Sequence, residues 1–201
     1  MVAAGLRPIV FAISLLPLVW LARNAWLGEL GINPIETVNR YLGDWALRFL
    51  LIALAVTPLR RVTGWPGLAR LRRMLGLFAF AYAILHLASY LGLDLFFDWR
   101  SFGQDILRRR YISLGMVAFV LLLPLALTST NGMVRRLGGQ RWRALHMLVF
   151  PLSMFAVAHY WLMVKADIRA PLVHAAFLAS LLGVRLFTQW RKETIPAGGA
   201  S

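Results

Sequence analysis

RRMLGLFAFAYAILHLASY, residues 72–90, is the stretch of sequence that decides the fold class. Two arginines precede an apolar run, and about 20 apolar residues cross roughly 30 Å of hydrocarbon as a helix. His86 lies inside that run, with leucines on either side. Because an imidazole is costly to place in a membrane, this stretch predicts a transmembrane helix and also marks a candidate functional residue.

The composition of the whole chain is that of a membrane protein. Hydrophobic residues make up 60% of its 201 residues and the mean hydropathy is +0.67, whereas soluble domains are nearer half apolar. The net charge of +14 does not indicate nucleic acid as a partner, because the arginines fall in short stretches between apolar runs, as topology determinants do. The absence of cysteine excludes disulfides, thiolate zinc sites, iron–sulfur clusters and cysteine nucleophiles.

The apolar runs predict an all-α integral membrane bundle of six transmembrane helices. We interpret residues 1–192 as a single domain, with the first apolar run retained as a membrane span rather than removed as a signal peptide, and residues 193–201 as a disordered tail. Short connections favour antiparallel neighbours in a compact bundle. The six predicted spans are residues 8–27, 43–59, 74–92, 110–128, 145–164 and 171–190.

Charge in the connecting segments predicts the orientation. The segments RRVTGWPGLARLRR and NGMVRRLGGQRWR are rich in arginine and lack acids, so we expect them on the cytoplasmic side, together with both termini. The acids are expected in the outer loops, with none inside a span. Arg108 to Arg110 stand on the outer side against this rule, partly offset by Asp105.

Two histidines are predicted to lie at the same depth. At ~1.5 Å per residue, His86 lies ~18 Å and His159 ~21 Å from the same edge of the membrane, on two parallel spans. Two neutral imidazoles at one level on facing helices can bind a haem iron axially from opposite sides. We therefore interpret His86 and His159 as axial metal ligands of an upper cofactor site.

A second, lower level is predicted from His146 and Arg72. His146 lies 13 residues before His159, about 20 Å lower by helical rise, and Pro151 between them either kinks the helix or is tolerated as gentle curvature. Arg72 stands 14 residues before His86. An arginine there suits a flavin phosphate or a haem propionate, while the alternative is a charge that sets topology only.

The remaining polar residues indicate no catalytic centre. The sequence suggests no carboxylate pair or Ser–His–Asp arrangement inside the bundle, and no acid in mid-span for a proton-coupled transporter. His174 is expected at the outer interface. Arg48 and Arg185 are expected to extend toward the membrane surfaces, and Arg48 also to be within reach of the propionates of an upper haem.

Four stretches of the chain resemble a known family. RRMLGLFAFAYAILHLASY, LALTSTNGM, RRLGGQRWRALHMLVF and AHYWLMVK, with His86, His146, His159 and Trp142 in this order, resemble the MsrQ (formerly YedZ) family of haem-binding membrane subunits. That family belongs to the ferric-reductase-like transmembrane group, in which spans three and five usually carry two histidines each. Arg72 departs from the wider pattern, and the MsrQ family shares the departure.

The resemblance implies haem b and FMN as cofactors and the bacterial inner membrane as location. It further implies electron transfer from the quinone pool or a cytoplasmic flavin reductase to MsrP, a periplasmic molybdopterin-containing methionine-sulfoxide reductase. Sulfoxide reduction would then occur on the partner. Whether the lower site holds FMN or a second haem stays open, and the alternatives are another cytochrome b of the ferric-reductase type or a non-redox transporter or assembly factor.

Overall fold

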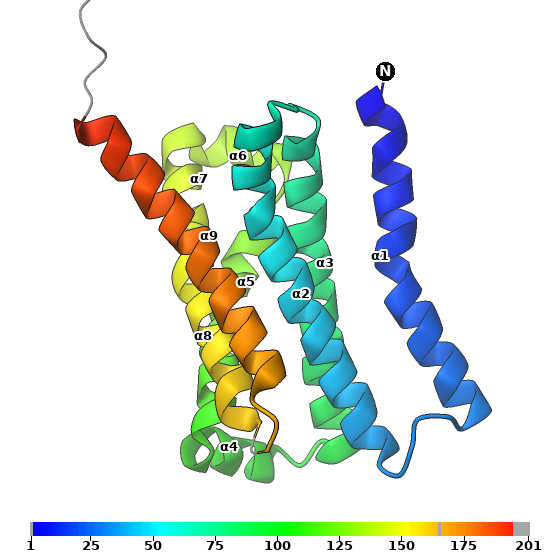
Figure 1. Cartoon of the computed structure of the whole chain (residues 1–201). Coiled ribbons are helices and arrows are strands. Elements are labelled where there is room, and N and C mark those ends of the chain that lie inside the picture. The colour runs from blue at the N-terminus through cyan, green and yellow to red at the C-terminus, as the bar shows by residue number, and fades with distance from the viewer. Residues whose placement is uncertain (1, 165, 195–201) are drawn as a thin grey trace, which may run out of the picture.

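The computed structural model describes residues 2–164 and 166–194, and this part is almost entirely helical (Figure 1). It contains six spans that are long and apolar enough to cross a membrane. The predicted all-α fold with six spans is therefore confirmed, and the chain is a multi-pass membrane protein. The spans are formed by α1 (Val2–Leu27), α2 (Pro34–Thr63), α3 (Leu68–Ser89) with its π-helical extension Tyr90–Asp94, α5 (Arg110–Leu127), α7 (Gly139–His146) with α8 (Val149–Met163), and α9 (Arg169–Thr194).

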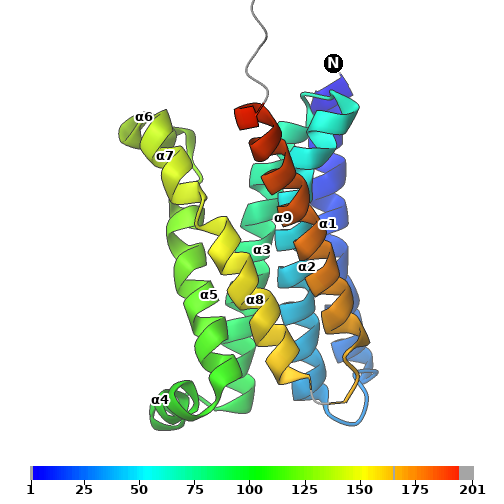
Figure 2. The same ribbon diagram turned by 60° about the vertical axis from the view of Figure 1, so that its left-hand side comes forward.

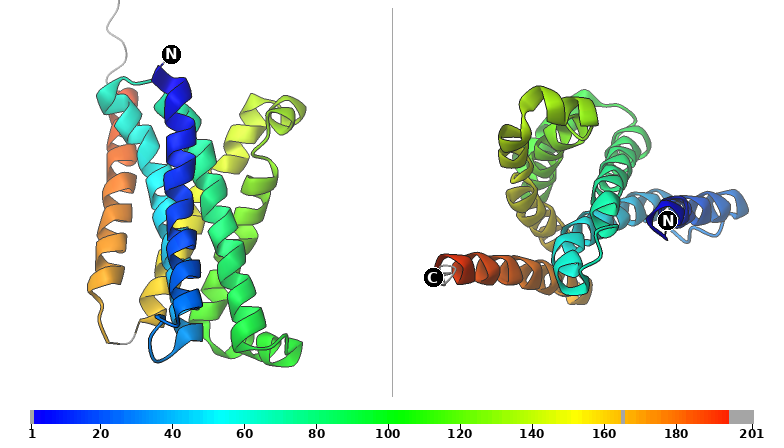
Figure 3. Two further views of the ribbon diagram at one scale, coloured as in Figure 1. Left: turned by 90° about the vertical axis from the view of Figure 1, so that its right-hand side faces the viewer. Right: turned by 90° about the horizontal axis from the view of Figure 1, so that it is seen from above.

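Four of the spans form the central bundle. Helices α2 and α3 pack along each other, α5 packs along α8, and the two pairs face one another, while α1 and α9 lie outside (Figures 2 and 3). The first and last helices have their chain-terminal ends at the same end of the bundle (Figure 1). Of the predicted tail, 193 and 194 belong to α9, and 195–201 lie outside the described residues.

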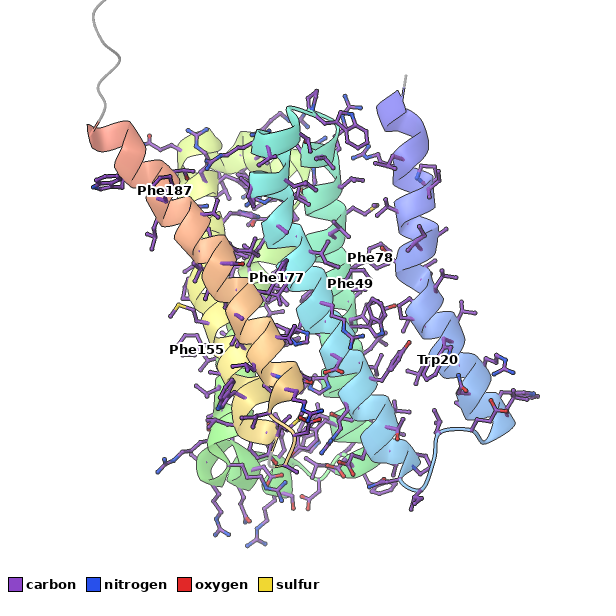
Figure 4. The ribbon with its side chains drawn as sticks, in the orientation of Figure 1. Trp20, Phe49, Phe78, Phe155, Phe177 and Phe187 are labelled. Carbon is purple, nitrogen blue, oxygen red and sulfur yellow. The ribbon has the colours of Figure 1, made fainter. Side chains whose placement is uncertain are left out.

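Aromatic packing attaches α1 to the bundle. Phe11 of α1 contacts Phe78 of α3 with ring centroids 5.3 Å apart, and Phe78 in turn contacts Phe49 of α2 at 5.6 Å (Figure 4). Tyr82 is fully buried, and its hydroxyl donates a hydrogen bond of 2.9 Å to the backbone carbonyl of Ser14 in α1. A buried hydroxyl needs such a partner, so this bond fixes α1 against α3.

Connections between the spans are shorter than the sequence predicts. Helix α2 begins after the cap residue Asn33, whose side chain accepts a hydrogen bond from the N–H of Glu36, and ends at Gly64, which adopts a left-handed conformation (φ 66°). Only residues 64–67 then separate α2 from α3. All five arginines predicted in this loop therefore lie on the ends of two helices.

Pro151 coincides with a break in the fifth span. α7 ends at His146 and α8 begins at Val149. Because proline has no N–H, it cannot donate to the carbonyl of Met147 four residues earlier, and that carbonyl instead accepts from the N–H of Phe150 at 3.1 Å. Of the two alternatives left open by the sequence, the structure shows the kink.

A short helix, α4 (Trp99–Arg108), replaces the predicted outer loop between the third and fourth spans. Asp98 caps its start, accepting hydrogen bonds from the backbone N–H groups of Arg100 and Ser101 and from the Ser101 hydroxyl. These bonds hold the pKa of the Asp98 carboxyl below its usual value. The Tyr90 hydroxyl donates to Asp105 at 2.5 Å and ties α4 to the end of the third span. The sequence analysis did not predict this helix.

Candidate cofactor sites between the helices

The fold brings His86 of α3 and His159 of α8 together. Their ring centroids lie 6.2 Å apart, with an angle of 67° between the ring planes. Both line a cavity of about 180 Å³ between the two helix pairs. The equal depth predicted for these residues thus becomes direct proximity, although they are separated by 73 positions in the sequence.

A neighbouring helix fixes each imidazole. Nδ1–H of His86 donates to the backbone carbonyl of Asn39 on α2 at 2.9 Å, and Nδ1–H of His159 donates to that of Tyr111, at the start of α5, at 2.6 Å. A carbonyl oxygen can only accept, so Nδ1 carries the hydrogen in both rings. Each Nε2 therefore keeps its lone pair, which is the state that a metal ligand requires.

Two glycines make these hydrogen bonds possible. Gly43 and Gly115 each lie four residues after the accepting carbonyl, where a helical side chain would point back over it. A Cβ on Gly43 would lie 3.1 Å from His86 Nδ1, and one on Gly115 only 2.8 Å from His159 Nδ1. The absence of a side chain is therefore what lets each ring approach its carbonyl. Sequence analysis missed both glycines, although their 72-residue spacing nearly repeats the spacing of the histidines.

The geometry of the pair fits a metal bound between the two rings. Two imidazole nitrogens that bind one ion from opposite sides at about 2.0–2.1 Å place their ring centroids roughly 6.3 Å apart, because a ring nitrogen lies ~1.1 Å from its centroid. The observed 6.2 Å agrees. No group of three or more His, Cys, Asp or Glu side chains suited to a metal ion occurs among the described residues. A pair of axial ligands suits haem iron, whose other ligands come from the porphyrin.

Small residues line part of the cavity beside the histidines. Seven of its lining residues are glycine or alanine, which lets the helices stand close without filling the space between them. These residues include Gly43, Ala46, Ala79, Ala83, Gly115 and Ala118.

Asp44 corrects the expectation that no acid lies inside a span. It belongs to α2, directly after Gly43, and lines the upper cavity. Its carboxylate pairs with Arg48 at 3.6 Å and lies near the Tyr160 hydroxyl. Sequence analysis overlooked it, since the residue falls at the edge of the predicted span 43–59. Arg48 itself lies over the Trp45 ring and is not part of the cavity wall, whereas Arg40 is.

A second cavity, of about 340 Å³, contains the two residues predicted for the lower level. His146 and Arg72 both line it, with Arg60, Arg73 and Trp142. Arg72 donates a hydrogen bond of 3.4 Å to the Thr57 hydroxyl. The wall carries three arginines and no carboxylate, so the site presents positive charge to any ligand.

The His146 ring in this cavity has one nitrogen without a partner. Its Nδ1–H donates to the Trp142 carbonyl at 3.1 Å, while Nε2 is buried and makes no hydrogen bond. Trp142 stacks on the ring at 3.9 Å between centroids and donates from its indole N–H to the Thr128 carbonyl. A buried, unpaired acceptor is unfavourable by about 1–3 kcal/mol, which indicates that Nε2 meets a ligand group.

Arg73 is a lower-site residue that the sequence analysis did not select. It precedes His86 by 13 residues, the spacing that separates His146 from His159, so it is the positional counterpart of His146 on α3. Its guanidinium donates to the Asn131 side chain at 2.6 Å.

His174 and Arg185 do not line either cavity. Nδ1–H of His174 donates to the Ala170 carbonyl of its own helix, and the ring meets Tyr160 edge-on at 5.4 Å. The Arg185 guanidinium lies 4.0 Å from the centroid of Phe150. Neither residue is brought to the paired histidines.

Comparison with known proteins defines the class of this fold and site. The family model described as the ferric reductase like transmembrane component matches residues 42–158, which include all of α3 with His86, all of α5, and most of α2 and of α8, and end one residue before His159. The chain therefore belongs to the ferric-reductase-like transmembrane proteins.

Similarity to individual relatives is closer still. The chain is 56% identical over 187 residues to the protein-methionine-sulfoxide reductase heme-binding subunit MsrQ of Rhodospirillum rubrum, covering 93% of this chain and 90% of the relative. It is 53% identical over 166 residues to MsrQ of Caulobacter vibrioides (83% and 79% covered) and 48% identical over 191 residues to that of Herminiimonas arsenicoxydans (94% and 88%). The chain belongs to the MsrQ family, and the resemblance seen in its sequence is confirmed.

The glycine beside His159 has a measurable role. We predict that Gly115→Ala lowers the free energy of unfolding by about 1–3 kcal/mol, because the new methyl group displaces the ring and breaks its hydrogen bond. Gly43→Ala should have a smaller effect, since its contact is longer. Gly183→Ala on α9, where no atom lies within 4 Å, is the matched control. Thermal unfolding in detergent measures all three, and equal stability of Gly115→Ala and Gly183→Ala would contradict this role.

Proposed function

We propose that this chain binds haem b between His86 and His159 and transfers electrons across the bacterial inner membrane to a periplasmic methionine-sulfoxide reductase subunit. The observation that carries the proposal is the paired imidazoles, whose ring centroids lie 6.2 Å apart and whose Nδ1–H groups each donate to a backbone carbonyl of a neighbouring helix. Membership of the MsrQ family, whose curated members are named heme-binding subunits of this reductase, supports it.

The residues around the upper site perform three tasks in this proposal. Asn39 and Tyr111 hold the ring tautomers through their carbonyls, the glycines permit the approach, and the apolar wall excludes water. Haem iron held there supplies reversible one-electron transfer. Because reduction of a sulfoxide to a sulfide and water consumes two electrons and two protons, the partner must collect two such transfers.

We propose FMN as the ligand of the lower cavity. Arg60, Arg72 and Arg73 offer donors for a phosphate group, and Trp142 offers an aromatic surface beside His146. The second candidate is a haem bound through the free Nε2 of His146. In either case the lower site receives electrons from the quinone pool or from a cytoplasmic flavin reductase, and the upper site passes them outward.

The orientation proposed here places α4 outside and the short helix α6 (Asn131–Leu137) inside, with both termini cytoplasmic. The arginine-rich ends of α2 and α3 and the arginines of α6 and α7 then follow the positive-inside rule. The catalytic partner, which by this proposal carries the molybdopterin, meets the end of the bundle where the upper cavity lies.

Removal of the paired histidines tests the upper site. His86→Ala and His159→Ala should each abolish the low-spin b-type signal in the reduced-minus-oxidised spectrum of the purified protein, since a single remaining imidazole leaves the iron with one axial ligand. A colourless wild-type preparation, or a low-spin signal that survives in both variants, would refute the assignment and favour a non-redox membrane protein.

His146 and His174 form a matched pair of variants for the lower site. His146→Ala should reduce the flavin bound per chain severalfold and leave the upper haem spectrum unchanged, because His146 lines a different cavity from His86 and His159. His174→Ala, which lines neither, should change nothing. Haem and flavin are quantified after extraction. Loss of haem instead of flavin in His146→Ala would identify a second haem as the lower ligand.

The orientation can be tested by thiol labelling, because the chain contains no cysteine. Gln104→Cys on α4 should react with a membrane-impermeant maleimide in intact spheroplasts, and Gln140→Cys on α7 only after lysis. Both glutamines are exposed, so reactivity reports the side of the membrane rather than burial. The reverse pattern would invert the proposed direction of electron transfer.

A further inference from the structure

We propose that α4 and the turn before it form the docking surface for the electron acceptor, and that the acceptor presents an acidic patch there. This inference rests on the proposed function for its redox role. It gives a purpose to the arginines that stand on the outer side against the positive-inside rule. The docking surface is defined by Phe97, Trp99, Arg100, Leu107 and Arg108.

The first argument is that aromatic contacts run from the upper cavity to this surface. Tyr90 and Phe102 line the cavity, and their ring centroids lie 6.4 Å apart. Phe102 meets Trp99 edge-on at 6.3 Å, and Trp99 lies 6.5 Å from Phe97. Trp99 and Phe97 are 64% and 62% exposed. A partner on this surface is therefore joined to the cavity by a continuous series of four aromatic rings.

The second argument is the charge of the outer face of α4. Arg100, Gly103, Gln104, Leu107 and Arg108 follow each other at helical spacing and are all exposed. Among the described residues, Arg100, Arg108 and Arg110 form no ion pair, whereas Arg109 pairs with Asp105 at 2.9 Å. In Figure 4, nitrogen-tipped side chains extend from this end of the bundle away from the helices. Unpaired arginines on an exposed face attract an acidic surface and accelerate its association.

The third argument separates a protein partner from the lipid headgroups. An amphipathic helix that lies on a bilayer buries its apolar face in lipid. In α4 the inner face, with Phe102, Asp105 and Ile106, packs toward the bundle, where Asp105 accepts from Tyr90 and Phe102 reaches the cavity. The face left free carries Arg100, Gln104 and Arg108 together with the exposed Trp99 and Leu107. Aromatic residues and arginine are the types enriched at protein–protein interfaces, so this combination suits contact with a protein partner.

The surface is also held in a fixed shape. Phe96 and Phe97 both adopt positive φ angles (48° and 61°), and the Phe97 N–H donates to the Leu91 carbonyl at 2.8 Å. Asp98 caps the helix that follows. Left-handed conformations are unfavourable for residues other than glycine, and they persist where the surrounding contacts determine them. The turn therefore presents its rings and arginines in one arrangement.

The test compares two charge reversals in the full chain, embedded in nanodiscs of neutral lipid. Arg100→Glu/Arg108→Glu alters the proposed surface, and Arg135→Glu/Arg136→Glu on α6 is the matched control, with two exposed arginines at the opposite end of the bundle. Binding of the purified sulfoxide-reductase subunit is measured first, which requires no cofactor in the chain. Reoxidation of the dithionite-reduced chain by oxidised partner is then followed by stopped flow, each haem losing one electron and the partner centre gaining one.

We expect the α4 reversal to weaken binding and slow reoxidation by about tenfold at low ionic strength, with the difference vanishing near 0.5 M salt, and the α6 control to behave as wild type. Reoxidation by dioxygen, a small neutral oxidant, should be unchanged in both.

Equal effects of the two reversals, or none, would overturn the proposal. A parallel thermal unfolding measurement in nanodiscs of anionic lipid tests headgroup contact: an α4 reversal that leaves partner binding intact but unfolds at a lower temperature than wild type there would overturn the proposal in favour of lipid. If the purified wild-type chain contains no haem but the α4 reversal still weakens binding of the partner, the proposed function is refuted and the docking surface is supported.

Discussion

Two desolvated imidazoles, each satisfied by a backbone carbonyl of the neighbouring helix, set the geometry on which the rest of the structure depends. A helix carbonyl oxygen normally accepts a hydrogen bond only from the N–H four residues later, and the side chain at that later position lies over the oxygen. Because residues 43 and 115 are glycines, no side chain covers the carbonyls of Asn39 and Tyr111, and each imidazole can donate to the oxygen. These contacts lie where α2 packs on α3 and where α5 packs on α8, and both rings line the cavity between the two pairs.

The two cavities differ in a way that gives the bundle a direction. The upper one has paired, fixed imidazoles in a mostly apolar wall, which suits a tightly held metal cofactor. The lower one has a single histidine with an unpaired nitrogen, a stacked tryptophan and three arginines, which suits an anionic, exchangeable ligand. The break of the fifth span before Pro151 lets the two histidines of that span serve different cavities. The end of the bundle near the lower cavity is rich in arginine, and the end near the upper cavity exposes Phe97 and Trp99.

Much of this could be predicted from the chain, and the failures have physical reasons. Span number follows from hydropathy alone, and the matched depth of His86 and His159 follows from helical rise. Asp44 was missed because an acid at the edge of an apolar run looks like an interfacial residue until the helix is seen to extend nine residues earlier. The helix α4 was missed because short amphipathic segments rich in charge resemble loops. The assignment of ligands to the two cavities stays a prediction.

The sequence by itself determined that this protein crosses the membrane six times, that it is all-helical, and that it belongs to the MsrQ family, because apolar length and local residue order are written along the chain. Tertiary structure alone decided which groups meet: His86 with Asn39 and Gly43, and His159 with Tyr111 and Gly115. It also decided that Phe102 reaches the cavity while Arg100 and Arg108 face outward. These contacts join residues 43 to 48 positions apart or depend on the direction of a helix face, and neither is fixed until the helices pack.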